Sequence, residues 1–299
     1  MQITQTIPET RAVLKALRAG NKTVALVPTM GALHAGHLSL MGAARAEADL
    51  VVASIFVNPL QFAPTEDLAR YPRPFEADRA LLEAAGVDLL FAPTVADIYP
   101  RGQAGTTTVN VPDLSNCLDG ASRPGHFTGV STVVAKLFGI IQPDLAFFGQ
   151  KDAAQVAVLR RMVADLDLPV LLRVCPTVRE PDGLALSSRN RYLTPEDRIA
   201  ALALSRALRA AEDAIHAGTT DPASLEQTLY EHLTQDPAVR LDYAAVVDPD
   251  TLAPIPDLTA GALLAVAAWV GKTRLIDNLL LPAAAAASAP ATEQEPAHA

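Results

Sequence analysis

Two histidines three residues apart stand where an apolar strand pattern changes into a helix pattern. The run 24–27 is apolar and a helix pattern begins near Gly36, so His34 and His37 lie at a strand-to-helix junction. A helix N-terminus has unpaired N–H groups and the positive end of the helix dipole, and it therefore attracts phosphate. Imidazoles placed there can hydrogen-bond phosphate oxygens while charge moves during phosphoryl or nucleotidyl transfer. The junction thus predicts a phosphate-binding site, and Gly31 and Gly36 let a ligand approach the backbone closely.

The same histidine spacing fits two other interpretations. Histidines beside a turn are often packing or surface residues, and histidines at i and i+3 can also bind zinc. Zinc is disfavoured because no nearby cysteine or third histidine completes a ligand set. The spacing alone does not separate a nucleotide site from a structural role.

The segment 56–62, FVNPLQF, places two amide side chains just past a strand pattern. Neutral amides such as Asn58 and Gln61 can hold the hydroxyl and carboxylate groups of a small polar substrate. Asn-Pro is also a common turn signal, and a simple turn explains the segment equally well.

The segment 147–155, FFGQKDAAQ, ends an apolar run at Gly149 and enters a helix pattern. Lys151 beside this turn is suited to contact phosphate, whereas Asp152 also suits a helix N-cap. Gln155 lies one turn further along the helix, facing the strand ends.

Two further loops carry basic side chains. The segment 184–191, LALSSRNR, can close over a triphosphate with Arg189 as a charge clamp, or it is a solvated polar turn. The segment 120–129, GASRPGHFTG, contains Arg123 and His126 and is either a flap near the site or an irregular surface loop.

Alternating strand and helix patterns must position these groups. Strand patterns occur at 24–28, 50–57, 88–92, 144–148 and 170–174. Helix patterns occur at the N-terminus, from Gly36 through Arg45, and near 75–85, 130–142 and 152–165. Near-continuous apolar strands separated by helices predict a parallel sheet covered on both faces. Ligands bind such sheets at the carboxyl ends of strands, near a topological switch point, so the polar segments are expected to share one edge.

The pattern changes after Pro176. A long helix begins at the Thr194-Pro195-Glu196 capping signal, a second lies near 222–235, and strand patterns follow at 241–247, 263–270 and 274–280. We therefore expect an α/β first domain over 1–176 and a smaller α+β domain over 177–282. The alanine-rich, Pro-containing segment 283–299 is expected to be a disordered tail.

The composition of the chain indicates which binding partners and which cellular compartment to expect. The formal net charge is −9, which argues against a nucleic-acid footprint. Two cysteines supply no disulfide framework, as expected in a reducing cytoplasm. The N-terminus lacks the apolar core of a signal peptide, and no run is long enough to span a membrane.

Seven motifs in order resemble the pantothenate synthetase family of HxGH nucleotidylyltransferases, over roughly residues 1–282. They are PTMGALHAGH, SIFVNPLQF, YPR, GASRPGHF, FGQKD, DGLALSSRN and LIDN. The resemblance implies a Rossmann-like domain with a smaller C-terminal lid, usually in a homodimer. It also implies a cytoplasmic, AMP-forming ligase that joins pantoate to β-alanine with ATP and Mg²⁺, through a pantoyl-adenylate and release of pyrophosphate.

The resemblance also implies residue roles. His34 and His37 match the histidines that stabilise the pentacovalent phosphorus, with His37 as proton donor, and Lys151 and Arg189 supply positive charge. The ATP-binding positions are Met30, Gly31, Ala32, Leu33, His34, Ala35, Gly36, His37, Gly149, Gln150, Lys151, Asp152, Val178, Leu186, Ser187, Ser188 and Arg189. Gln61 and Gln155 match the pantoate-holding glutamines, Asn58 a supporting contact, and Asp78 an acidic residue that helps to hold magnesium. Pro181 departs from the polar residues expected before Asp182-Gly183.

Two alternative functions are considered beside this one. The HxGH element also serves adenylyl transfer to other small acceptors, but FVNPLQF and GASRPGHF disfavour those relatives. A catalytically silent nucleotide-binding module is disfavoured because both histidines, Lys151 and the segment 187–189 are retained.

Overall fold

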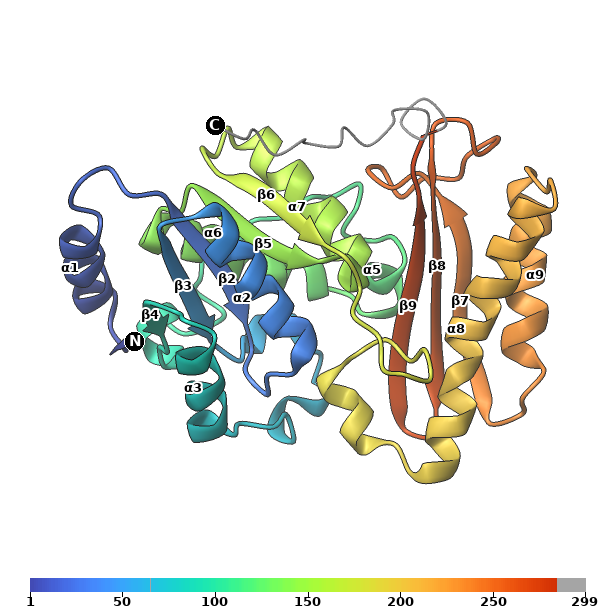
Figure 1. The fold of residues 1–299 in the computed structure, drawn as a ribbon, viewed down its shortest axis with the longest axis horizontal. Helices are drawn as coiled ribbons and strands as arrows, with labels where there is room; N and C mark the ends of the chain where they lie inside the picture. The colour runs from blue at the N-terminus through green and yellow to red at the C-terminus, as the bar shows by residue number, and fades with distance from the viewer. Residues whose placement is uncertain (65, 284–299) are drawn as a thin grey trace, which may run out of the picture.

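The computed structural model describes residues 1–64 and 66–283. A parallel sheet with helices on both faces stands beside a smaller antiparallel sheet that carries two helices (Figure 1). The predicted disordered tail, 283–299, lies outside the described residues except for its first residue.

The larger sheet has six parallel strands. Their spatial order is β1 (Gln2–Thr4), β4 (Leu89–Phe91), β3 (Leu50–Ile55), β2 (Val24–Thr29), β5 (Leu145–Gly149) and β6 (Leu171–Cys175). The strand order reverses between β2 and β5, which is the position where open α/β sheets bind ligands. The predicted Rossmann-like parallel sheet is therefore confirmed, and the histidine junction and the Lys151 turn follow the two strands that flank the switch point.

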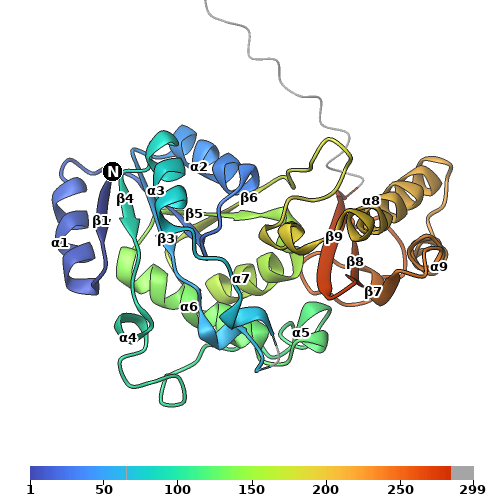
Figure 2. The ribbon, with the colours of Figure 1, turned by 90° about the horizontal axis from the view of Figure 1, so that it is seen from below.

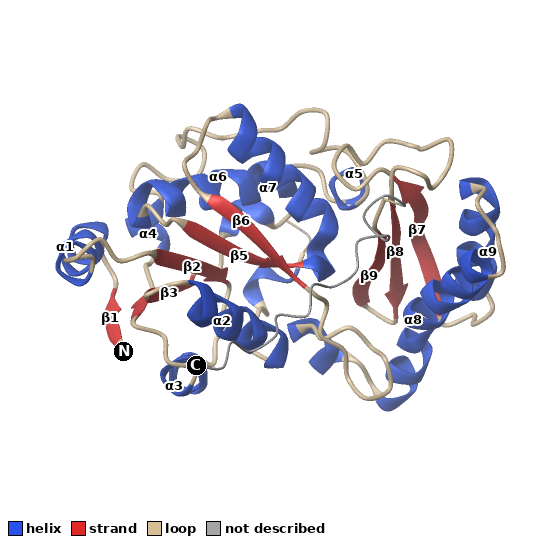
Figure 3. Ribbon diagram, turned by 45° about the horizontal axis from the view of Figure 1, so that its top comes forward, coloured by secondary structure: helices blue, strands red, loops and turns tan. Residues whose placement is uncertain are grey.

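Helices cover both faces of this sheet. On β2, Val24 and Leu26 face a core shared with α6 (His126–Ile141) and α7 (Ala153–Asp165), and α1 (Ile7–Leu17) packs on the same side. Ala25 and Val27 face the other core, with α2 (Ala35–Glu47) and α3 (Phe75–Ala84). Figures 2 and 3 show the strands between these two helix layers. This packing explains why the strands are apolar on both faces rather than alternating.

Two local predictions were wrong. The N-terminal segment begins with strand β1, which pairs with β4, before the expected helix α1. A three-residue edge strand carries little pattern of its own, and its partner is distant in sequence. The basic segment 120–129 is largely helical, because α5 (Asp119–Ser122) occupies its start and α6 begins at His126, after Gly125 adopts φ of 82°.

The second sheet is antiparallel, in the order β7 (Val239–Val247), β8 (Ala262–Val270), β9 (Thr273–Leu281). One face packs on α8 (Pro195–His216) and α9 (Pro222–Thr234), and the other joins the core of the larger sheet through residues such as Leu263 and Ala265. The predicted α+β character of this part is confirmed. The Thr194 cap is formed as expected, since its Oγ1 accepts the N–H of Asp197 at 3.1 Å.

Remaining elements are short. They are α4 (Val95–Ile98) and the 3₁₀ turns η1 (Pro59–Gln61), η2 (Asp67–Ala69), η3 (Gln150–Asp152) and η4 (Ser188–Tyr192). Within the described ranges, no helix has the length and apolar character needed to cross a membrane. Cys117 and Cys175 are both free thiols.

Candidate active site

The turn between β2 and α2 is held by a buried carboxylate. Gly31 and Ala32 take left-handed backbone conformations, with φ of 80° and 53°. Their geometry is supported by Asp78, which is 2% exposed and accepts the N–H groups of Ala32 at 2.7 Å and Leu33 at 2.8 Å. Because a glycine tolerates positive φ, Gly31 suits the turn. The turn is therefore braced by Asp78 in α3, on a different element from the strand and helix that it joins.

The two junction histidines lie against each other at the N-terminus of α2. Their ring centroids are 4.1 Å apart, and His34 is the N-cap residue. A Cβ on residue 36 would lie 3.0 Å from Nδ1 of His34, so Gly36 leaves the room that this ring needs. The glycine of the HxGH motif thus allows the first histidine to fold over the helix start.

Both histidines are neutral at pH 7. Burial, aided by the charge of Lys151, lowers the pKa of His34 to about 4. Burial, aided by His34, lowers the pKa of His37 to about 3. Nδ1 of His37 accepts the backbone N–H of His34 at 3.3 Å, so the proton of the neutral ring is on Nε2. His37 therefore carries a neutral N–H donor beside the helix N-terminus.

The two amide side chains of the FVNPLQF segment, Asn58 and Gln61, have different roles. Asn58 is 1% exposed, and its Oδ1 accepts the Tyr99 hydroxyl at 2.7 Å while its Nδ2 donates to Gln61 Oε1 at 3.0 Å. Nδ2 of Asn58 also donates to the carbonyl of Gly129 at 3.0 Å. Asn58 therefore positions Gln61, whose Nε2 lies 3.2 Å from the sulfur of Met30 and is directed to the site.

The turn η3 carries Lys151 at the end of β5. Its Nζ lies 3.6 Å from Oδ1 of Asp152, and the two side chains are 20% and 49% exposed. Gln155 follows in α7 and lines the same cavity as the histidines. The backbone of the turn is bonded to Asn278 of β9, whose Nδ2 donates to the carbonyls of Gln150 and Lys151.

The segment 178–191 is docked against residues 66–71. Arg189 donates from Nε and Nη2 to the carboxylate of Asp67, at 3.1 and 3.2 Å. Burial alone would raise the pKa of Asp67, but the hydrogen bonds and charge of Arg189 outweigh it and lower that pKa. The hydroxyls of Ser188 and Tyr71 are 3.3 Å apart. The predicted phosphate clamp is therefore paired with an acidic side chain in this structure.

A second ion pair lies beside Gln61. Arg123 contacts both carboxylate oxygens of Glu66, at 2.5 and 2.9 Å, and its Nη1 is 3.0 Å from Nε2 of His126. Nδ1 of His126 is 2.8 Å from the carbonyl oxygen of Gln61. Burial and Arg123 lower the pKa of His126 to about 4. Arg123 and His126 thus support the Gln61 turn and also line the cavity.

These groups converge on a cavity of about 190 Å³. The predicted residues that line it are Met30, His34, Gly36, His37, Gln61, Gly149, Lys151, Asp152, Gln155, Val178, Leu186, Ser187, Ser188 and Arg189. The predicted residues outside its lining are Gly31, Ala32, Leu33, Ala35, Asn58, Asp78 and Gln150.

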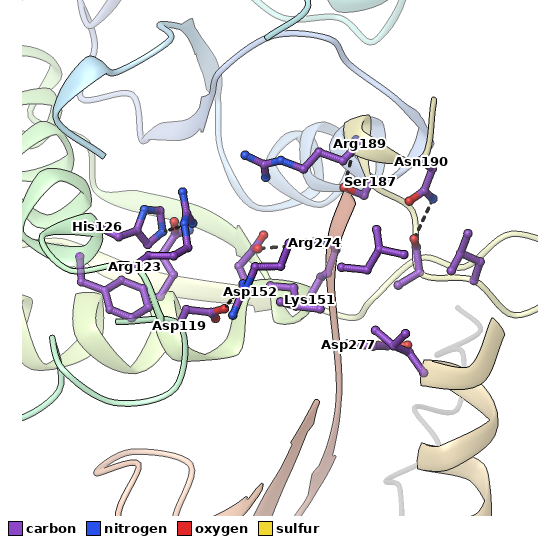
Figure 4. Close-up of a pocket in the computed structure, with 17 residues that line it drawn as sticks. Asp119, Arg123, His126, Lys151, Asp152, Ser187, Arg189, Asn190, Arg274 and Asp277 are labelled. Carbon is purple, nitrogen blue, oxygen red and sulfur yellow. Dashed lines mark hydrogen bonds and ion pairs between the residues drawn. The ribbon is translucent and has the colours of Figure 1, made fainter. Parts of the chain in front are cut away.

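An adjoining hollow, drawn in Figure 4, shares Lys151, Asp152 and Arg189 with this cavity and extends toward Asp277. In that view, Lys151 and Asp152 lie between the Arg123–His126 pair and the loop that carries Ser187 and Arg189.

The expected magnesium site has no cage of protein ligands. In residues 1–64 and 66–283, no group of three or more His, Cys, Asp or Glu side chains could hold a metal ion. Both oxygens of Asp78 accept backbone N–H groups, and Asp78 lines a separate hollow with Arg73 and Phe75. This geometry favours a positioning role for Asp78 over the predicted role as a metal ligand.

Sequence reasoning assigned no role to three side chains that hold the site together. Asp67 pairs with Arg189, Tyr71 contacts Ser188, and Asn278 contacts the η3 turn. Tyr71 belongs to the YPR motif and Asn278 to the LIDN motif. These two motifs are the sequence signal that could have pointed to both residues.

The parallel sheet, the phosphate-binding helix start and the cationic turn at the switch point define a nucleotide-binding α/β enzyme. A model of the family described as pantoate-beta-alanine ligase matches residues 2–280. The chain belongs to this pantoate–β-alanine ligase family, and the predicted ligase class is confirmed.

Relatives in sequence agree with this assignment. The pantothenate synthetase of Acidobacterium capsulatum is 57% identical over 292 residues, covering 94% of this chain and 97% of the relative. That of Moorella thermoacetica is 54% identical over 281 residues, covering 94% of this chain and 99% of the relative.

Solved structures agree as well. The pantothenate synthetase of Thermus thermophilus has a TM-score of 0.88 at 52% identity, covering 93% of this chain and 99% of that one. The pantoate–β-alanine ligase of Francisella tularensis, complexed with β-γ ATP and β-alanine, has a TM-score of 0.78 at 35% identity. That comparison covers 94% of this chain and 97% of the Francisella chain.

Proposed function

We propose that this chain joins pantoate to β-alanine in two steps at the cavity between β2 and β5. In the first step, the pantoate carboxylate attacks the α-phosphorus of ATP, forming pantoyl-adenylate and releasing pyrophosphate. In the second, the amine of β-alanine attacks the acyl carbon and AMP leaves. The observation that carries the proposal is the convergence of two neutral histidines, Lys151 and two glutamines on one cavity.

The residues have separate tasks in this scheme. Negative charge builds on the equatorial oxygens of the α-phosphoryl group, where N–H donors and a fixed cation stabilise it best. We assign this field to His34, His37 and Lys151, which all line the cavity. Gln61 and Gln155 hold the pantoate, and Asn58 keeps the Gln61 amide in the orientation that offers its N–H₂ group.

The remaining predicted contacts belong to the nucleotide. We assign ATP to the segment 30–37, the turn 149–152, Val178 and the loop 186–189. Arg189 reaches the phosphates by exchanging its partner Asp67 for them. Closure of this loop protects the mixed anhydride from water.

We propose that Mg²⁺ binds to the protein together with the triphosphate of ATP. Magnesium commonly uses one or two carboxylates together with substrate phosphates, so the lack of a cage among the described residues is compatible with it. We also propose a homodimer and a cytoplasmic location from the family pattern, and a domain boundary near residue 176 from the change in sequence pattern after Pro176.

Isotope exchange between pyrophosphate and ATP tests the two-step scheme. Exchange should require pantoate and proceed without β-alanine, whereas AMP should accumulate only when all three substrates are present. An absolute requirement for β-alanine in the exchange reaction would contradict the adenylate intermediate.

A further inference from the structure

Asn278 of the LIDN motif connects the antiparallel sheet to the Lys151 turn. It is 6% exposed and lies in β9, an edge strand of the antiparallel sheet. Its Nδ2 donates to the carbonyl of Gln150 at 3.0 Å and to that of Lys151 at 2.9 Å. Its Oδ1 accepts from Nε2 of Gln150 at 3.1 Å. One buried amide therefore makes three hydrogen bonds to a turn 127 and 128 residues away in sequence.

The chemistry of this contact requires an amide. Two neighbouring carbonyl oxygens need a group with two N–H donors, and the side chain of Gln150 needs an acceptor beside them. An aspartate at 278 would retain the acceptor but would turn an oxygen toward both carbonyls. An alanine would leave the carbonyls without this partner.

The adjacent residue holds a second segment of the site. Asp277 is 3% exposed and accepts from both terminal nitrogens of Arg179, at 2.6 and 2.9 Å. Its Oδ1 also accepts the backbone N–H of Asn278 at 2.8 Å. The Asp277–Asn278 pair thus links the η3 turn with the start of the loop that leads to Arg189.

From these contacts we infer that Asn278 is a positioning residue for Lys151. The inference rests on the proposed function, in which Lys151 stabilises the phosphoryl group. Within the described residues, the carboxylate paired with this ammonium is that of the adjacent Asp152, at 3.6 Å, so the path of the turn backbone decides where the Lys151 side chain starts. The antiparallel sheet therefore takes part in the phosphate chemistry by fixing the Lys151 turn.

Two variants at position 278 test this. Asn278→Asp and Asn278→Ala should lower the rate of pantoate-dependent pyrophosphate–ATP exchange by about 10- to 100-fold, since misplacement by about 1 Å can cost 10²-fold. The KM for pantoate should change far less than this rate, because Gln61, which holds pantoate in the proposed function, is positioned by Asn58 and not by this turn. Leu280→Ala, on an exposed position of the same strand, is the control and should leave the exchange rate unchanged.

A double-mutant cycle separates positioning from general destabilisation. In a Lys151→Ala background, Asn278→Ala should have almost no further effect, because the group it positions is gone. Independent, multiplicative losses would overturn the inference, and so would a folded Asn278→Ala protein with an unchanged exchange rate. Thermal melting establishes folding, and if Asn278→Asp does not fold, Asn278→Ala decides the result.

The same cycle distinguishes this inference from the proposed function. Lys151→Ala should itself lower exchange on the order of 10²–10³-fold. If Lys151→Ala is neutral, the proposed role of Lys151 fails, and the inference about Asn278 falls with it. If Lys151→Ala is severe and Asn278→Ala is neutral, only the positioning role of Asn278 fails.

Discussion

Two regions that line the cavity are held in place in different ways. The junction 28–37 is braced by a buried carboxylate, because Asp78 accepts two backbone N–H groups at 2.7 and 2.8 Å. The loop 178–191 is held by side chains that reach other segments, among them the Arg179–Asp277 pair at 2.6 Å and the Arg189–Asp67 pair at 3.1 Å. In the latter pair, the arginine side chain is 28% exposed and the aspartate 14%.

This difference separates a preformed part of the site from an adjustable part. Leaving a buried N–H group unsatisfied costs roughly 1–3 kcal/mol, whereas an exposed ion pair is worth about 0–1 kcal/mol. The Arg189–Asp67 pair lies between these two cases, and a triphosphate can replace Asp67 because it offers the guanidinium the same negative charge. The junction, in contrast, should keep one geometry with or without substrate.

Removing a histidine of the preformed junction should have the largest effect. His37→Ala should lower kcat on the order of 10²–10³-fold, because a donor that acts on developing charge is lost. The KM for ATP should change far less, as measured by steady-state kinetics. His216→Ala, at the exposed end of α8, is the matched control. Equal losses in kcat and in ATP binding would contradict a transition-state role.

Weakening the contact of Asp78 with the junction should have the second largest effect. Asp78→Asn presents an N–H₂ group to one of the two backbone N–H donors, so the free energy of unfolding should fall by about 1–3 kcal/mol. Urea unfolding measures this loss. The dependence of the rate on Mg²⁺ concentration should stay unchanged in the folded variant. A large increase in the Mg²⁺ requirement would instead support Asp78 as a metal ligand.

Acid should weaken the junction before it weakens the loop. His34 and His37 have pKa values of about 4 and 3 in the folded chain, against about 6.5 when unfolded. The stability that the two neutral histidines contribute to the fold is complete above pH 6.5. It is lost as the pH falls toward 4, because the histidines of the unfolded chain bind protons first. The pKa of Asp67 is lowered below its ordinary value, so its ion pair persists through this range.

Urea unfolding at pH 7 and pH 5 measures this dependence. Each histidine contributes at most about 1.4 kcal/mol per pH unit. A His34→Gln, His37→Gln double variant should show a shallower loss of stability than the parent chain. An identical slope in both proteins would show that these histidines are not the groups responsible.

Releasing the adjustable loop should have the smallest effect. If Asp67 competes with phosphate for Arg189, Asp67→Asn should lower the KM for ATP by about two- to fivefold, because an amide binds the guanidinium less strongly than a carboxylate does. Arg189→Ala should raise that KM and spare pantoate. A higher KM for ATP in Asp67→Asn would show instead that Asp67 holds Arg189 in its binding position.

Local pattern was enough to predict the elements with strong periodicity. The apolar run 24–27 and the histidines after it form β2 and the start of α2 as expected. Except for β1, the strands of both sheets are also found, with ends shifted by one or two residues. Such elements bury their own side chains, so their signal lies within the segment itself.

The contacts between segments could not be predicted in the same way. Asn58 was expected to touch substrate, yet its donors and acceptor are used by Gln61, Gly129 and Tyr99. The pairing of Asp67 with Arg189 joins residues 122 positions apart. These partners are selected by the folded topology, and no local spacing encodes them.

Strand β8 has a consequence for how the chain is made. Leu263 and Ala265 complete the core of the parallel sheet, while Leu264 and Val266 complete the core under α8 and α9. A ribosome synthesising this protein therefore releases the first six strands well before the residues that seal their core. The nascent chain carries an unsealed apolar surface until its last quarter emerges, and the Lys151 turn acquires its Asn278 partner later still.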